Sequence, residues 1–295
     1  MADVHAPDSR QYYIPQNSPW PIRGSIAMFA IMAGAIAFLN DWAGAWSFIP
    51  GALLLAYMFF GWFSTVIDEN QHGIFNMQVD RSFRMGMMWF IFSEVMFFAA
   101  FFGALFYARV LSVPWLGGQG VKVFTNFILW PQYEAAWPTN GPGHVGGLAN
   151  GSFDPMAPTP IPAINTAILL TSGFTVTMAH HALRAGRRTP LKIWLALTFL
   201  LGFTFVGLQA HEYGEAYGEM GLRLTTGIYG STFFMLTGFH GAHVTLGTLI
   251  LVVMLVRIMR GHFDPDQHFG FEAAAWYWHF VDVVWLGLFI FVYVL

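Results

Sequence analysis

Seven long apolar segments constrain the fold of this chain more than any other feature of its sequence. Each is close to the roughly 20 apolar residues that an α-helix needs to cross a bilayer. They cover about residues 22–41, 47–67, 83–109, 161–183, 191–212, 227–257 and 272–294. None shows the two-residue alternation that is typical of a half-buried strand. The sequence therefore predicts an all-α membrane protein with seven transmembrane helices in a single subunit spanning residues 1–295.

The composition supports this interpretation and excludes several kinds of site. Of the 295 residues, 56% are hydrophobic and only 10% are charged, whereas soluble domains carry about 25% charged residues. The net charge of −3 gives no indication of a nucleic-acid partner. Because the chain has no cysteine, disulfides, thiolate-bound zinc or iron–sulfur clusters and cysteine-ligated copper are excluded.

Lysine and arginine predict the orientation of the helices. With the N-terminus in the cytoplasm, the inside holds ten of the basic residues and the outside holds three, Arg109, Lys122 and Arg223. The ten are Arg10, Arg23, Arg81, Arg84, Arg184, Arg187, Arg188, Lys192, Arg257 and Arg260. Because cytoplasmic loops are enriched in basic residues, this distribution favours a cytoplasmic N-terminus. Seven spans then place the C-terminus in the periplasm.

One connection is much longer than the others. Residues 110–160 contain the stretch WPTNGPGHVGGLANGSFDPMAPTPIP, and this Gly- and Pro-rich composition predicts an irregular extramembrane loop. The first twenty residues show no signal or transit peptide pattern. Together these two features favour the plasma membrane of a bacterium, with an organelle-encoded chain, which would also lack a presequence, as the alternative.

Glu94 is the most notable polar residue within the apolar segments. It lies eleven residues after Phe83, or about 16 Å along a helix, which is near the middle of a bilayer. Ionisable residues at that depth are expensive and often functional. Glu94 is therefore interpreted as a proton-handling group or an acid facing a polar cavity. A neutral acid bonded to a neighbouring helix is the alternative.

The last apolar segment carries Glu272, Trp276, His279 and Asp282. At 100° per residue these four fall within about 120° of one another around a helix axis. They form one stripe that we expect to face protein, while the remaining surface faces lipid or apolar neighbours. The stripe is interpreted as a structural hydrogen-bond network, with a chemical role as the alternative.

His240 and His243 are spaced to lie near one face of the sixth helix. With Glu94 they could form a metal site, but dimetal bundles use Glu-x-x-His pairs and no such pair is in register. Packing with hydrogen bonds across a glycine-lined contact is the favoured interpretation.

Four further ionisable residues stand at predicted helix ends and are expected at the membrane interface. They are His180, His181, His211 and Glu212. A role as haem ligands is the alternative for His180 and His181.

A basic group, comprising Arg257, Arg260, His262 and His268, lies between the last two segments. Cationic side chains there suit anionic lipid headgroups, although ordinary positive-inside bias explains them equally well. The sequence contains no Walker, GxSxG or HExxH motif. No complete catalytic constellation is present.

Several stretches nevertheless resemble subunit III of the haem–copper cytochrome c oxidases. They occur in the order of that family and cover the third to the seventh segments almost continuously. They are FSEVMFF, INTAILLTSG, AHHAL, LQAHEY, IYGSTFFMLTGFHGAHV and GFEAAAWYWHFVDVVWL. The last of these is long and highly specific.

The resemblance implies a fold and a function. It implies a two-helix bundle and a five-helix bundle around a lipid-filled cleft. It also implies a noncatalytic subunit that binds phospholipids and supports proton uptake and turnover stability of subunit I. Haem and copper would belong to the partner subunits I and II, which receive electrons from cytochrome c, and this chain would hold no metal.

The resemblance also assigns roles to individual residues. It implies that Glu94 is the intramembrane glutamate beside the lipid cleft, and that Arg257, Arg260, His262 and His268 contact lipid headgroups. Two further classes of function are kept as alternatives. One is a membrane metalloenzyme with Glu94, His240 and His243 as ligands, and the other is a proton-coupled transporter that uses Glu94 and Asp282.

Overall fold

The computed structural model describes residues 17–148, 151–265 and 267–295, so Arg10 of the predicted cytoplasmic group lies outside the described residues. Within them, seven helical segments are long and apolar enough to cross a membrane, and the predicted all-α fold is confirmed. These segments are Trp20–Leu39, Ala45–Gln71, Met77–Leu116, Ile161–Arg184, Arg188–Gly218, Gly227–Met259 and Phe269–Val294.

The chain divides into two compact units, one ending at Met85 and the other comprising Gly86–Leu295. The first unit contains the helices α1 (Trp20–Leu39) and α2 (Ile49–Gln71), joined through a short 3-10 helix, η1 (Ala45–Phe48). The indole of Trp20 donates a hydrogen bond to the Thr65 hydroxyl at 3.1 Å. The hydroxyl of Ser47 donates to the Gly34 carbonyl at 3.0 Å. The first bond joins the start of α1 to the later part of α2, and the second joins α1 to η1 near the opposite end of the pair.

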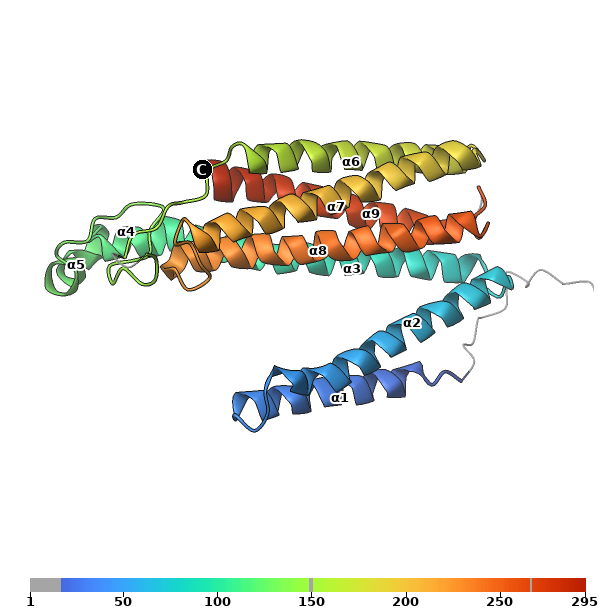
Figure 1. The fold of residues 1–295 in the computed structure, drawn as a ribbon, viewed down its shortest axis with the longest axis horizontal. Coiled ribbons are helices and arrows are strands. Elements are labelled where there is room, and N and C mark those ends of the chain that lie inside the picture. The colour runs from blue at the N-terminus through green and yellow to red at the C-terminus, as the bar shows by residue number, and fades with distance from the viewer. Residues whose placement is uncertain (1–16, 149–150, 266) are drawn as a thin grey trace, which may run out of the picture. The chain divides into compact units, whose positions relative to one another are not determined.

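The second unit is built from five long helices that run alongside one another (Figure 1). They are the part of α3 (Met77–Phe106) that follows Met85, together with α6 (Ile161–Arg184), α7 (Arg188–Gly218), α8 (Gly227–Met259) and α9 (Phe269–Leu288). A π-helical turn, η4 (Phe289–Val294), continues α9. Both α7 and α9 pack against α6 and α8, so the buried core of this unit lies among these four helices, while many large apolar side chains on their outer surfaces and on α3 are exposed.

Trp278 on α9 occupies the centre of this unit and is completely buried. A Cβ atom added at Gly202 of α7 would lie 2.8 Å from the indole, and one added at Gly247 of α8 would lie 2.9 Å from it. Small residues are therefore required where these helices meet the ring. The indole nitrogen donates to the Ser172 hydroxyl on α6 at 2.9 Å, because a buried N–H group needs a partner.

The segment 110–160 is less irregular than its composition predicts. A π-helical turn, η2 (Tyr107–Ser112), carries α3 into α4 (Val113–Leu116), and after η3 (Gly120–Lys122) comes a second short helix, α5 (Val123–Leu129). The run YARVLSVPWL contains no glycine. Its only proline, Pro114, stands in the first turn of α4, where a missing N–H group is tolerated. The third helix therefore continues past its predicted end at residue 109.

Glycine ends two of the helices. Gly186 after α6 and Gly261 after α8 adopt φ values of +68° and +81°. The amide of Arg187 then donates to the Ala182 carbonyl at 2.9 Å, and that of His262 donates to the Arg257 carbonyl at 3.1 Å. These are Schellman motifs, which satisfy the last carbonyls of a helix. Basic residues stand directly at or after these two helix ends, Arg187 and Arg188 after α6 and Arg260 after α8.

Candidate functional site

Glu94 on α3 meets His243 on α8 through an ion pair or hydrogen bond. The distance between Glu94 Oε2 and His243 Nε2 is 2.9 Å, and their side chains are 21% and 16% exposed. The other ring nitrogen of His243 lies 2.6 Å from the Phe239 carbonyl, which can only accept a hydrogen bond. Hence Nδ1 carries a proton.

This geometry requires a proton between the two side chains. With Nδ1 protonated, a neutral His243 offers only a lone pair at Nε2. The contact is then either a carboxylic acid donating to imidazole or an imidazolium donating to a carboxylate. Both arrangements are neutral overall, so the pair places two ionisable groups in a membrane-spanning region without an isolated charge, whose cost there would be high.

Aromatic rings surround the Glu94–His243 pair. The Tyr277 ring stacks on the imidazole with centroids 6.3 Å apart, and Phe98 approaches it edge-on at 5.1 Å. The Tyr277 hydroxyl donates to the His243 carbonyl at 3.5 Å. The pair is thus held between α3, α8 and α9, all within the second unit.

His240 does not join this pair. It is completely buried, and its Nε2 lies 3.2 Å from the Val281 carbonyl on α9, while its ring contacts Phe205 and Trp285. The three residues considered as metal ligands therefore do not converge. His240 instead links α8 to α9.

The polar stripe of α9 faces α6. His279 Nε2 lies 3.2 Å from the Thr177 hydroxyl, and the Asp282 carboxylate packs directly against Gly173. His279 Nδ1 lies 3.6 Å from Asp282 Oδ2. Asp282 is buried, whereas the His279 side chain is 46% exposed on the subunit surface. Gly173 is needed here because a side chain would displace the carboxylate.

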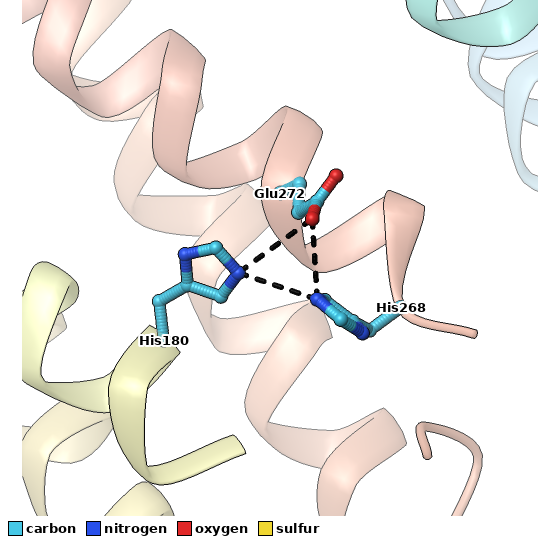
Figure 2. Close-up of side chains that lie close together, drawn as sticks. All are labelled: His180, His268 and Glu272. Carbon is cyan, nitrogen blue, oxygen red and sulfur yellow. Dashed lines mark hydrogen bonds and ion pairs between the residues drawn. The ribbon is translucent and has the colours of Figure 1, made fainter. Parts of the chain in front are cut away.

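At the start of α9, the stripe ends in a cluster of three side chains (Figure 2). Glu272 from the first turn of α9 faces His268 just before that helix and His180 from the last turns of α6. The facing atoms are 3.2 to 3.7 Å apart. His268, grouped above with the lipid-contacting residues, is only 8% exposed and points into this cluster. For Arg257, Arg260 and His262, contact with lipid headgroups stays a prediction.

Those three residues lie at the end of α8. Arg260 is exposed, while Arg257 and His262 are half-buried. The Arg257 guanidinium lies 4.2 Å from the centre of the Phe263 ring, a cation–π contact. Partial removal from water, and then the charges of Arg257 and Arg260, lower the pKa of His262. Two permanent cations and a neutral histidine thus stand together at this helix end.

The interfacial prediction is wrong for Glu212. Its side chain is completely buried, and Oε1 accepts a hydrogen bond from the Tyr293 hydroxyl at 2.7 Å, whereas the neighbouring His211 is exposed. The reason is the length of α7, which runs to Gly218 rather than ending at residue 212. The polar sequence EYGEAYG favours a helix end, but its tyrosines pack against α8.

Comparison with known proteins assigns the chain to a family. The family of cytochrome c oxidase subunit III matches residues 10–129 and 121–295. Cytochrome c oxidase subunit 3 of Carassius auratus is 40% identical over 289 residues, which cover 98% of each chain. The subunit 3 of Latimeria chalumnae is 40% identical over 288 residues, again 98% of each. That of Prototheca wickerhamii is 40% identical over 284 residues, 96% of each. This multi-pass membrane chain belongs to the cytochrome c oxidase subunit III family.

Proposed function

We propose that this chain is a noncatalytic subunit that supports proton uptake and turnover stability of subunit I during oxygen reduction. As a family member it is part of an oxidoreductase complex with other oxidase subunits, and its family has no redox cofactor of its own. The observation that supports the finer role is the Glu94–His243 pair. It is a proton-sharing pair inside a membrane-spanning region of a subunit without redox chemistry.

The pair suits proton handling for a chemical reason. A proton that sits between a carboxyl group and an imidazole can move between the two atoms without leaving an isolated charge in the membrane. The pair therefore buffers charge at that depth, and replacing either partner removes this capacity. In the proposed role, the pair holds and exchanges a proton close to subunit I, and so limits the build-up of charge there while the enzyme turns over.

Phospholipid binding is the second part of the proposal. Arg257, Arg260 and His262 offer cationic and hydrogen-bonding groups where α8 ends, and such groups suit anionic headgroups. The chains of these lipids would lie against the apolar surfaces of the transmembrane helices, many of whose large side chains are exposed. The lipid-filled cleft between a two-helix and a five-helix bundle stays a prediction.

The partners and the membrane complete the proposal. Subunits I and II would hold haem and copper and receive electrons from cytochrome c. The basic residues support an N-terminus in the cytoplasm and a C-terminus in the periplasm. The bacterial plasma membrane stays a prediction from the sequence, because the relatives named above are eukaryotic.

Turnover-dependent inactivation tests the proposed role. The oxidase would be purified through a tag on this chain, with haem and copper measured on the product, and its activity followed over many turnovers. We expect Glu94→Ala and His243→Gln to inactivate the enzyme in fewer turnovers than the wild type. The matched control is Glu215→Gln, which changes a partly exposed carboxylate paired with His211 at 3.4 Å. Equal lifetimes for all four proteins would contradict the role of the pair, and a chain that purifies without haem would contradict the complex.

A further inference from the structure

The cluster at the start of α9 has a geometry that the proposed function does not use. His180 Nε2 lies 3.3 Å from His268 Nε2 and 3.7 Å from Glu272 Oε1, and His268 Nε2 lies 3.2 Å from the same oxygen. The three atoms form a nearly equilateral triangle, and all three side chains point toward its centre (Figure 2). Among the described residues, no other set of three or more metal-ligating side chains converges in this way.

Hydrogen counting shows that this triangle needs a positive charge. His268 Nδ1 lies 3.2 Å from the Asp264 carbonyl, which can only accept, so this nitrogen carries a proton. A neutral His268 then presents a lone pair at Nε2 toward the Glu272 carboxylate, which is also an acceptor. The single Nε2 hydrogen that His180 can contribute satisfies only one of these two acceptors, the His268 nitrogen or the Glu272 carboxylate. Either an additional proton or a cation must lie among the three atoms.

The distances fit a metal ion. Zinc binds histidine nitrogen and carboxylate oxygen at about 2.0–2.2 Å with tetrahedral geometry. Two ligand atoms of such a site are therefore roughly 3.3–3.6 Å apart, close to the three separations given above. The Asp264 carbonyl supplies the outer hydrogen bond that fixes the tautomer of a ligating histidine.

We propose that His180, His268 and Glu272 form a binding site for a divalent transition-metal ion of the zinc type. Two imidazoles favour zinc over magnesium or calcium, which prefer oxygen ligands. The three ligands leave one tetrahedral position for a water molecule. The side chains of His180 and Glu272 are 28% and 16% exposed, so an ion can enter from the subunit surface.

The bound ion would join two helices at a fixed point. His180 belongs to the last turns of α6, while His268 and Glu272 belong to the start of α9. A bond through the metal would add to the α6–α9 contacts made by Trp278 and His279 further along. Arg184, one turn after His180, brings a competing positive charge, so we expect weaker binding than at a structural zinc site with four ligands.

Metal counting on the whole oxidase tests this proposal. The complex that contains this chain would be stripped with a chelator and dialysed against Zn²⁺ in the presence of excess Mg²⁺. We expect the wild type to hold one more zinc per chain than either His180→Gln or Glu272→Gln. In these variants the dissociation constant of that site should rise at least 10–100-fold, since even outer-shell changes have effects of this size.

His211→Gln is the matched control, because His211 faces Glu215 at 3.4 Å on α7 without a third ligand among the described residues. It should bind as much zinc as the wild type. X-ray absorption at the zinc edge provides a second readout on the wild type, where we expect two imidazole nitrogens and one carboxylate oxygen. Equal zinc content in the wild type and both ligand variants would overturn the proposal. So would an absorption spectrum without histidine ligands, and in either case the triangle holds a proton.

Discussion

The Tyr293 hydroxyl is the only hydrogen-bond donor to the Glu212 carboxyl group among the described residues. Both side chains are buried. Tyr293→Phe would leave this acceptor without its partner, and such a loss destabilises a protein by about 1–3 kcal/mol. We expect a lower thermal midpoint for the purified oxidase, measured by the loss of helical circular dichroism or by the release of this chain from the complex.

The control for this variant is Tyr107→Phe. The Tyr107 side chain is 53% exposed, and its ring contact with Trp115 would survive the loss of the hydroxyl. Its effect should stay within about 0.5 kcal/mol, as for most surface changes. If the two variants melted together, the Tyr293–Glu212 bond would contribute nothing to stability.

His262 gives a pH dependence whose sign can be worked out. Partial burial and the charges of Arg257 and Arg260 lower its pKa, so the ring is neutral at pH 7 and gains a charge only as the pH falls. An anionic headgroup favours the charged ring, and by linkage protonation strengthens the binding of that headgroup. Retention of a spin-labelled phosphatidylglycerol by the oxidase should therefore increase between about pH 8 and pH 5.

His262→Gln isolates this contribution from other titrating groups. The variant keeps both arginines, so it should retain the anionic lipid at pH 8 as the wild type does, while the increase toward acid pH becomes smaller. A zwitterionic spin label should show little change in either protein. An unchanged pH profile in His262→Gln would exclude the ring as a headgroup ligand.

At the scale of helices, the close packing around Trp278 leads to a matched pair of variants on α8. A Cβ atom at Gly247 would lie 2.9 and 3.0 Å from two indole carbons, whereas one at Gly241 would have no neighbour within 4 Å. Gly247→Ala should destabilise the subunit by about 1–3 kcal/mol through overpacking. Gly241→Ala should be neutral or stabilising by up to about 1 kcal/mol, because alanine favours helix.

Thermal melting of the two α8 variants, side by side, provides the measurement. Both exchange glycine for alanine in the same helix, so the difference between them reports the contact with Trp278 rather than helix propensity. A Gly247→Ala protein that melts at or above the temperature of Gly241→Ala would mean that the indole moves aside easily.

The helices themselves could be predicted well from the sequence because hydrophobic length is a strong constraint. All seven apolar segments became helices, and the start of α6 at Ile161 agrees with the predicted residue. The ends were less predictable. Local polarity predicts that a helix ends at Glu212, but packing of Tyr213 and Tyr217 against Phe234 extends α7 to Gly218.

At the scale of the whole subunit, the pairing of residues across helices was beyond the sequence alone. Glu94 was identified by its depth, but its partner His243 is 149 residues away. His180 was expected at the interface, and His268 at lipid headgroups. They meet because packing brings the end of α6 to the start of α9, and no local pattern encodes that contact.

Orientation in the membrane is the prediction that concerns the whole molecule. The natural chain has no cysteine, so a single introduced thiol can be labelled on it without background. We expect an impermeant maleimide to label Val121→Cys from the periplasmic side of intact cells. Ala185→Cys, between α6 and α7, should react only after the membrane is opened. Both positions are exposed on the subunit, and Val121 is 92% exposed.

The expected asymmetry follows from the basic residues at the α6–α7 junction. Arg184, Arg187 and Arg188 lie beside Ala185, and positive charges of this density are retained in the cytoplasm. Val145 is 57% exposed in the same extramembrane segment as Val121. Val145→Cys is therefore a second labelling position, which should react even if a partner subunit covers Val121. Labelling of Ala185→Cys in intact cells, with protection of both valine positions, would reverse the topology and place the cluster of His180, His268 and Glu272 at the periplasmic face.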